Sequence, residues 1–132
     1  MEFCTAINCM DGRVQLPVIN YLKNRFKVDF VDTITEPGPC LILAENKPKE
    51  TINSLLQRVD ISVNGHGSKN LAIVGHFDCA GNPAGYEEQI VHIQKSVAFM
   101  RREYPHLQII GLWVAEGLEV LEVVTAINMG EQ

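Results

Sequence analysis

The chain has 132 residues, enough to bury one hydrophobic core, and its 46% hydrophobic and 20% charged residues are ordinary for a globular protein. Its formal net charge of −5 opposes binding to a phosphate backbone, which needs a basic surface, so nucleic acid is not expected as a partner. No apolar run is long enough for a membrane span, so no membrane partner is expected either. We therefore expect a single domain over residues 1–132.

The first residues of the sequence show neither the basic segment nor the apolar stretch of a secretory signal, which favours a cytoplasmic location. Because that compartment is reducing, the four cysteines are expected to be thiols, metal ligands or nucleophiles and not a disulfide framework. Their positions in the chain therefore matter more than their number.

The first predicted elements are a strand, a helix and a second strand. Residues 3–8 are short and largely apolar, which is typical of a buried strand. Apolar residues then recur at helical spacing over residues 16–26. Residues 28–34 are β-branched and aromatic and predict a second strand, which the turn-forming residues 36–39 bring to an end.

The middle of the chain continues the alternation. Residues 40–44 are apolar and fit either a helix or a strand, whereas residues 48–59 begin with a helix-start signal and carry an apolar stripe. After a turn-rich break at residues 64–68, the continuous apolar run of residues 71–76 predicts a third strand, buried on both faces. Residues 86–100 carry the apolar stripe of a long helix.

Two strand-like segments close the chain, residues 109–114 and 118–124, and the short turn between them predicts a hairpin. Strands that alternate with amphipathic helices pair in parallel through right-handed crossovers, with helices on both faces of the sheet. The expected fold class is therefore α/β, with a doubly wound, mostly parallel sheet of order 2-1-3-4 and a C-terminal antiparallel edge strand.

Reactive side chains gather in two loops that directly follow predicted strands. Residues 9–13, Cys-Met-Asp-Gly-Arg, follow the first strand, and residues 76–81, His-Phe-Asp-Cys-Ala-Gly, follow the third. In an open parallel sheet, ligands bind outside the carboxyl ends of the strands where the strand order reverses, here between the first and third strands. We therefore expect the two loops to meet.

His76 and Cys79 are three residues apart and can bind one ion from a single turn, while Cys9 supplies a thiolate from the neighbouring strand end. Two sulfurs and one nitrogen suit tetrahedral zinc, and a set of three protein ligands leaves a position for the water that a catalytic zinc acidifies. The alternative is two core thiols and a core histidine. A disulfide between Cys9 and Cys79 is geometrically possible, but a reducing compartment opposes it.

Asp11 and Arg13 lie in the first loop, next to the proposed zinc ligand Cys9. A paired guanidinium would hold the carboxylate as a hydrogen-bond acceptor, which could orient the acidified water for attack on an electrophilic carbon. Released from Arg13, the carboxylate could instead become the fourth zinc ligand. The alternative is a loop-capping salt bridge without chemistry.

The remaining candidates are assigned weaker roles. The Gly81 amide could donate to a bound substrate, although a plain turn explains this glycine nearly as well. Asp78 is expected to accept hydrogen bonds within its loop. Cys4 is expected in the core, and Cys40 follows a turn, a position compatible with exposure. Surface histidines are expected at His66, His92 and His106.

The two loops resemble the motifs of a known family. Residues 7–13, Ile-Asn-Cys-Met-Asp-Gly-Arg, resemble the Cys-x-Asp-x-Arg motif of β-class carbonic anhydrases. Residues 75–81, Gly-His-Phe-Asp-Cys-Ala-Gly, resemble their Gly-His-x-x-Cys-Gly-Gly motif. The order of the motifs, the crossover helices and the terminal hairpin around residues 113–118 match as well, so the resemblance covers nearly the whole chain.

The resemblance implies a zinc lyase of the carbonate dehydratase type, which reversibly hydrates carbon dioxide to bicarbonate. It also implies a homodimer or a dimer-based oligomer. Because the first predicted strand begins almost at Met1, the chain resembles a short, N-terminally truncated member of the family. The residues implied are zinc ligands at Cys9, His76 and Cys79 and a catalytic dyad of Asp11 and Arg13.

Two segments depart from the family's pattern. Residues 35–39 replace its Arg-Asn-Ala-Gly-Asn segment, and Ala80 replaces the first of two glycines. Two other functions are kept as alternatives. The altered residues 35–39 are compatible with hydrolysis of carbonyl sulfide or carbon disulfide on the same zinc, and the truncated N-terminus is compatible with a non-catalytic zinc module that acts as a sensor or interaction subunit.

Overall fold

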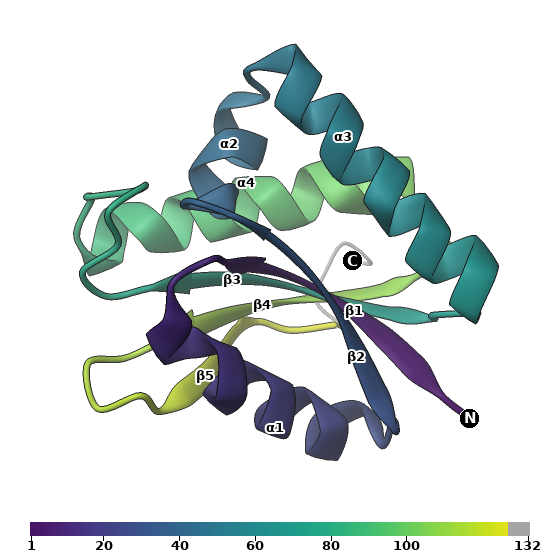
Figure 1. The fold of residues 1–132 in the computed structure, drawn as a ribbon. Helices are drawn as coiled ribbons and strands as arrows, with labels where there is room; N and C mark the ends of the chain where they lie inside the picture. The colour runs from purple at the N-terminus through teal and green to yellow at the C-terminus, as the bar shows by residue number, and fades with distance from the viewer. Residues whose placement is uncertain (127–132) are drawn as a thin grey trace.

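The computed structural model describes residues 1–126, and their centre is a five-stranded sheet with helices on both faces (Figure 1). The strand order is β2-β1-β3-β4-β5, in which the first four strands run parallel and β5 runs antiparallel to β4. The predicted fold class and strand order are therefore confirmed. The strands are β1 (Phe3–Cys9), β2 (Phe30–Glu36), β3 (Asn70–His76), β4 (Gln108–Val114) and β5 (Val120–Val124).

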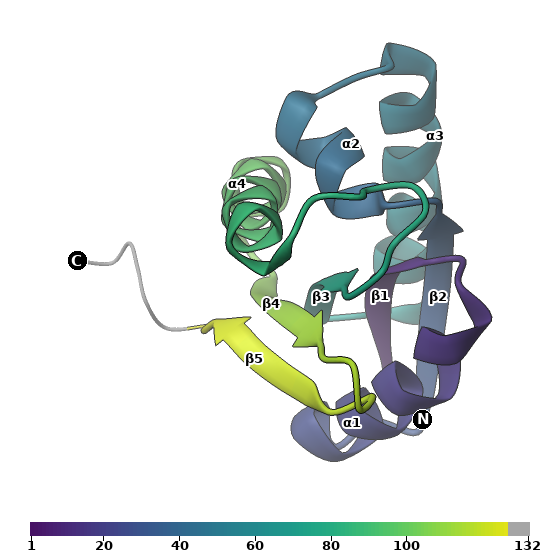
Figure 2. The same cartoon turned by 90° about the vertical axis from the view of Figure 1, so that its left-hand side faces the viewer.

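Helices cover the two faces unequally. One α-helix packs on one face, and the other three pack on the opposite face (Figure 1). Seen from the end of the sheet, β2 and β5 form its two edges (Figure 2). None of the described helices is long and apolar enough to cross a membrane. The single helix is α1 (Gln15–Phe26), and the other three are α2 (Pro39–Glu45), α3 (Lys49–Asp60) and α4 (Tyr86–Glu103).

Two apolar cores hold the layers together, one on each side of the sheet. Neighbouring residues Ile73 and Val74 of β3 belong to different cores, and both are fully buried, because successive side chains of a strand point to opposite faces. Leu55 of α3 packs in the core on the three-helix side, and Leu22 of α1 packs in the other. The central strands are thus covered on both faces, as their continuous apolar sequence predicts.

The structure differs from the predicted boundaries at two places near helix ends. Strand β2 begins at Phe30 and not at residue 28, because Lys27 takes a left-handed conformation (φ 56°) and the Val28 amide still donates to the carbonyl of Lys23. The ambiguous residues 40–44 lie within α2. A five-residue π-helix, Ile61–Gly65, extends α3 into the stretch that the sequence predicts as a turn.

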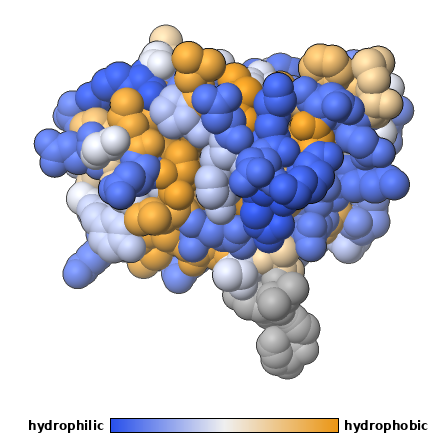
Figure 3. Space-filling view, turned by 90° about the horizontal axis from the view of Figure 1, so that it is seen from below, coloured by the Kyte–Doolittle hydropathy of each residue, from blue (hydrophilic) through white to orange (hydrophobic). Residues whose placement is uncertain are grey.

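The second strand of the terminal hairpin also starts later than the predicted residue 118. Leu118 adopts a positive φ of 70° in the turn, so β5 begins at Val120. Viewed from the side of α1, the surface is mostly hydrophilic, with an apolar band across one part of it (Figure 3).

Candidate metal centre

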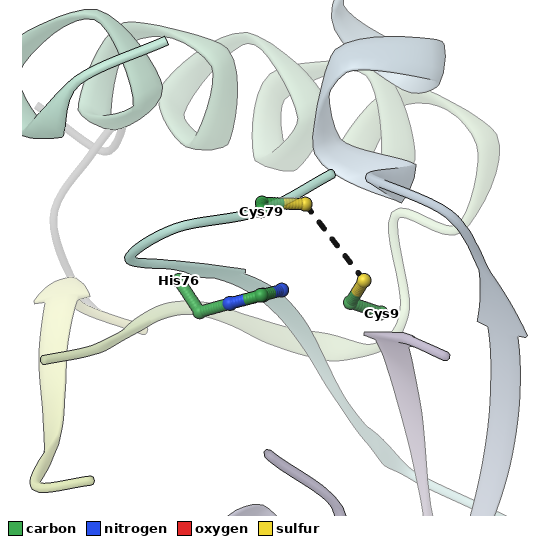
Figure 4. A group of neighbouring side chains, drawn as sticks. All are labelled: Cys9, His76 and Cys79. Atoms are coloured by element: carbon green, nitrogen blue, oxygen red, sulfur yellow. Dashed lines mark hydrogen bonds between the residues drawn. The ribbon is translucent and has the colours of Figure 1, made fainter. Parts of the chain in front are cut away.

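Parallel pairing of β1 with β3 brings three candidate ligands together. Cys9 is the last residue of β1, and His76 is the last residue of β3. Because these strands run parallel, both residues lie at the carboxyl ends of the strands, on the same side of the molecule. The loop after β3 returns Cys79 toward Cys9, and the sulfur atoms of these two residues lie 3.8 Å apart (Figure 4). The potential ligand atoms of all three residues lie within 4.8 Å of one another.

The spacing of the sulfurs fits a tetrahedral metal ion. Two thiolates bound to one zinc at about 2.3 Å with tetrahedral angles would lie about 3.8 Å apart. The observed distance between Cys9 Sγ and Cys79 Sγ is 3.8 Å. Both side chains are buried, with 3% and 4% exposed, so the two sulfurs face each other away from bulk solvent.

The imidazole of His76 is oriented as a metal ligand would be. Its Nδ1 donates to the carbonyl of Phe77 at 2.6 Å, so in the neutral imidazole Nε2 keeps a free lone pair. Among the described residues, this Nε2 is the one buried side-chain nitrogen or oxygen without a hydrogen-bond partner. Leaving such an atom unpaired costs about 1–3 kcal/mol, which a bound metal would offset. The three residues therefore fit zinc.

The two thiols share one negative charge. The adjacent Cys79 thiol donates to Cys9 and lowers the pKa of Cys9 well below its ordinary value, and this effect outweighs burial, which raises it. Backbone amides of Gly38 and Asp11 also donate to the Cys9 sulfur and lower its pKa. The Cys9 thiolate in turn raises the pKa of Cys79. Binding of a metal through both sulfurs would displace the proton that Cys79 holds.

Burial lowers the pKa of His76, but the Cys9 thiolate, the Phe77 carbonyl and the Asp11 carboxylate raise it, so the net shift is upward. The site thus attracts positive charge even in the absence of an ion. The same negative charges of Cys9 and Asp11 that favour the protonated imidazole would also attract a divalent cation.

Asp11 and Arg13 form the predicted pair. The guanidinium donates from Nε to Asp11 Oδ1 at 3.0 Å and from Nη2 to Oδ2 at 2.6 Å, a bidentate contact. These bonds, together with the one from the Arg13 backbone amide, lower the pKa of Asp11 to about 2. The carboxylate is therefore ionised at neutral pH and acts only as an acceptor.

Arg13 also joins the two loops, a contact that the sequence did not indicate. Its Nη1 donates to Asp78 Oδ2 at 3.3 Å, and its Nη2 donates to the Asp78 carbonyl at 3.1 Å. The guanidinium lies over the ring of Phe77, 4.8 Å from the ring centre. Asp78 accepts hydrogen bonds as expected, but its donor comes from the other loop.

Two further polar side chains shape the first loop and were missed by the sequence analysis. Asn8 is fully buried and accepts the Cys9 amide at 2.8 Å. Gln15 donates to the carbonyls of Cys9 at 2.7 Å and Asp11 at 3.0 Å. A signal was present for Asn8, because a polar residue inside an otherwise apolar strand needs a specific partner.

The weaker predictions fare unevenly. The Gly81 amide donates to the Cys79 sulfur, and its predicted donation to a substrate stays a prediction. Cys4 is fully buried, as expected, but Cys40 is also buried, with 1% exposed, because it lies in the apolar core on the three-helix side, where the Asn82 side-chain amide donates to its sulfur. His66 and His106 are exposed, as expected, and His66 pairs with Asp32; His92 is only half-exposed and pairs with Asn82.

Comparison with known proteins identifies the family. A family described as "Putative carbonic anhydrase" matches residues 1–124, which is nearly the whole chain. The chain belongs to this carbonic anhydrase family. No curated protein sequence matches the chain.

Solved carbonic anhydrase structures share the fold at low sequence identity. The carbonic anhydrase from Glaciozyma antarctica is 16% identical, with a TM-score of 0.58 over 91% of this chain and 81% of that chain. Tetrameric β-carbonic anhydrases from the ascomycete Sordaria macrospora are 14% identical, with a TM-score of 0.55 over 92% of this chain and 79% of that chain. The β-carbonic anhydrase CafA of Aspergillus fumigatus is 14% identical, with a TM-score of 0.53 over 98% of this chain and 78% of that chain. The fold of this family member is therefore the β-carbonic anhydrase fold.

Proposed function

We propose that the protein is a zinc-dependent enzyme that reversibly hydrates carbon dioxide to bicarbonate, and that residues 1–132 form one zinc-binding domain. The observation that supports the proposal best is the group of Cys9, His76 and Cys79, whose sulfur spacing and unpaired imidazole nitrogen suit a tetrahedral ion. Membership in a carbonic anhydrase family supports the reaction. When bound, zinc supplies a Lewis acid that makes a water molecule acidic near neutral pH.

The protein's own residues would orient that water. Asp11 is kept ionised by Arg13, so its carboxylate accepts a hydrogen bond and cannot return a proton at neutral pH. Its side chain is 20% exposed, whereas the three ligand residues are almost fully buried, so it lies on the solvent side of the site. Arg13 holds the carboxylate in place and is itself held by Asp78 and the Phe77 ring.

The direct test is stopped-flow hydration of carbon dioxide by reduced, zinc-loaded protein. The wild type should accelerate hydration, and Cys79→Ser should fall to the rate of the buffer. Asp11→Asn keeps the shape of the side chain but weakens it as an acceptor, and it should lose on the order of 100-fold or more. Equal rates for the three proteins would refute the proposal.

Carbonyl sulfide and carbon disulfide carry the same kind of electrophilic carbon and are the alternative substrates to compare with carbon dioxide. Product analysis with each gas, on the same zinc-loaded sample, should show carbon dioxide to be the fastest substrate. Faster release of hydrogen sulfide from either sulfur compound would overturn the assignment to carbon dioxide. Zinc uptake without turnover of any of the three gases would indicate a non-catalytic module.

We further propose that the protein assembles as a homodimer. Among the described residues, β2 pairs with β1 along one side only, so its other side is an open edge, and Phe30 at its start is 47% exposed. Open edges of this kind pair readily with another strand. Sedimentation should give the mass of a dimer, and Phe30→Lys should shift it toward the monomer, whereas a monomeric wild type would contradict the proposal.

A further inference from the structure

Gln89, in the first turns of α4, has a buried side chain with 1% exposed. Its Nε2 lies 2.9 Å from the carbonyl of His76, 3.1 Å from that of Asn82 and 3.1 Å from that of Ala84. The first of these carbonyls stands at the start of the loop that carries Cys79, and the other two stand at its end. One side-chain amide therefore ties the two ends of the loop together.

The loop depends on such a donor because it has no regular structure of its own. Residues 77–85 form neither helix nor strand, and the loop reaches α2 before it turns back to α4 (Figure 2). Its buried carbonyls cannot all be satisfied by a strand or helix ladder, and each one left unpaired costs about 1–3 kcal/mol. The Gln89 amide supplies the missing donor from the neighbouring helix.

The amide is fixed in orientation as well as in place. A Cβ added to Gly75 would lie 3.0 Å from Gln89 Oε1 and 2.9 Å from Ile93 Cδ1, so both side chains pack directly on the backbone of β3. The Cys40 thiol approaches the same Oε1 at 4.0 Å. With its oxygen on this side, the amide presents its N–H groups to the loop. Gly75 is thus the residue that allows this close approach.

We propose that Gln89 is a positioning residue that sets the zinc affinity of the group Cys9, His76 and Cys79. It acts through backbone carbonyls, by holding the loop between two of the ligands in the shape that brings Cys79 to Cys9. The proposal rests on the proposed function, because it takes zinc to be the metal of this site. Loss of an outer partner of this kind typically lowers metal affinity by about 10–100-fold.

Gln89→Met tests the proposal because methionine keeps the length of the side chain and has no donor. Gln94→Met is the matched control, since Gln94 lies on the same helix with its side chain exposed. Zinc dissociation constants are measured on reduced protein by competition with a chromophoric chelator. Gln89→Met should bind zinc about 10–100-fold more weakly than the wild type, and Gln94→Met should bind it equally well.

Hydrogen exchange of the metal-free proteins separates local positioning from general stability. In Gln89→Met, amides of residues 77–84 should exchange faster than in the wild type, while the central strands keep their protection. Gln89→Glu, which turns the donor into an acceptor, should give the same pattern. In the cobalt-loaded proteins, the thiolate charge-transfer bands of both variants should be weaker or shifted.

The outcomes distinguish this inference from the function on which it rests. A folded Gln89→Met protein that binds zinc as tightly as the wild type would overturn the inference alone. If Gln89→Met and Gln89→Glu both fail to fold, the residue has a general structural role, and the inference is likewise wrong. A wild type that takes up no zinc would overturn the proposed function and this inference with it.

Discussion

Gly38 and Gly81 meet backbone to backbone beside the candidate metal centre. A Cβ built on Gly81 would lie 2.8 Å from the Gly38 nitrogen, and one built on Gly38 would lie 2.7 Å from the Gly81 carbonyl carbon. The backbone amides of both glycines donate hydrogen bonds to the candidate ligands, Gly38 to the Cys9 sulfur and Gly81 to the Cys79 sulfur. Segments from opposite sides of the site are thus locked at a distance that only glycine allows.

Gly81→Ala should therefore disturb both stability and metal binding. Its Cβ would fall 2.5 Å from the Pro37 carbonyl carbon, which belongs to the backbone and cannot rotate away. The free energy of unfolding should drop by about 1–3 kcal/mol, and zinc affinity should fall. Urea denaturation and chelator competition measure the two effects. Gly12→Ala is the control, because a Cβ there meets no atom within 4 Å; equal behaviour of the two variants would contradict the contact.

The Asp11 carboxylate should leave a signature in the acid stability of the metal-free protein. Its pKa falls from 3.8 to about 2 in the folded state, so its contribution is fully present above about pH 4 and is lost as the pH falls toward 2. Urea denaturation at pH 4.5, 3 and 2 should show a smaller loss of stability for Asp11→Asn than for the wild type. Parallel curves for the two proteins would mean that Arg13 does not hold the carboxylate in solution.

Leu118→Gly should stabilise the protein. Leu118 has a positive φ of 70° and is 39% exposed, so its backbone is strained while the packing of its side chain is incomplete. A left-handed conformation costs a non-glycine residue about 1–2 kcal/mol, of which glycine's greater freedom in the unfolded chain cancels part. Thermal or urea unfolding should show a gain of about 0.5–1 kcal/mol. A loss of stability would show that the exposed leucine makes contacts that outweigh the strain.

Cys40 should resist alkylation in the native protein. Burial raises the pKa of its thiol to about 11, so at pH 8 it is protonated as well as inaccessible. After treatment with iodoacetamide at pH 8, mass spectrometry should find Cys40 unmodified, whereas the urea-unfolded control should be modified at all four cysteines. Labelling of Cys40 at the rate of a free thiol would contradict its burial in the core.

The sequence predicts the sheet and the gathering of the ligand loops because both follow from general rules of topology. Parallel crossovers fix the strand order. Cys9 and His76 then lie next to each other at the carboxyl ends of β1 and β3. Helix α2 stayed ambiguous because seven residues are too few to establish a helical period. The clamp by Gln89 could not be predicted, since a single polar residue on a helix does not reveal which distant carbonyls it meets.

In the proposed enzyme, two sulfurs and one imidazole, from loops far apart in the chain, hold one zinc ion. X-ray absorption at the zinc edge of reduced, zinc-loaded protein tests it most directly. We expect two sulfur ligands at about 2.3 Å and one nitrogen at about 2.0–2.1 Å, with one sulfur lost in Cys79→Ser. A shell of nitrogen and oxygen alone, or no uptake of zinc at one ion per chain, would contradict it.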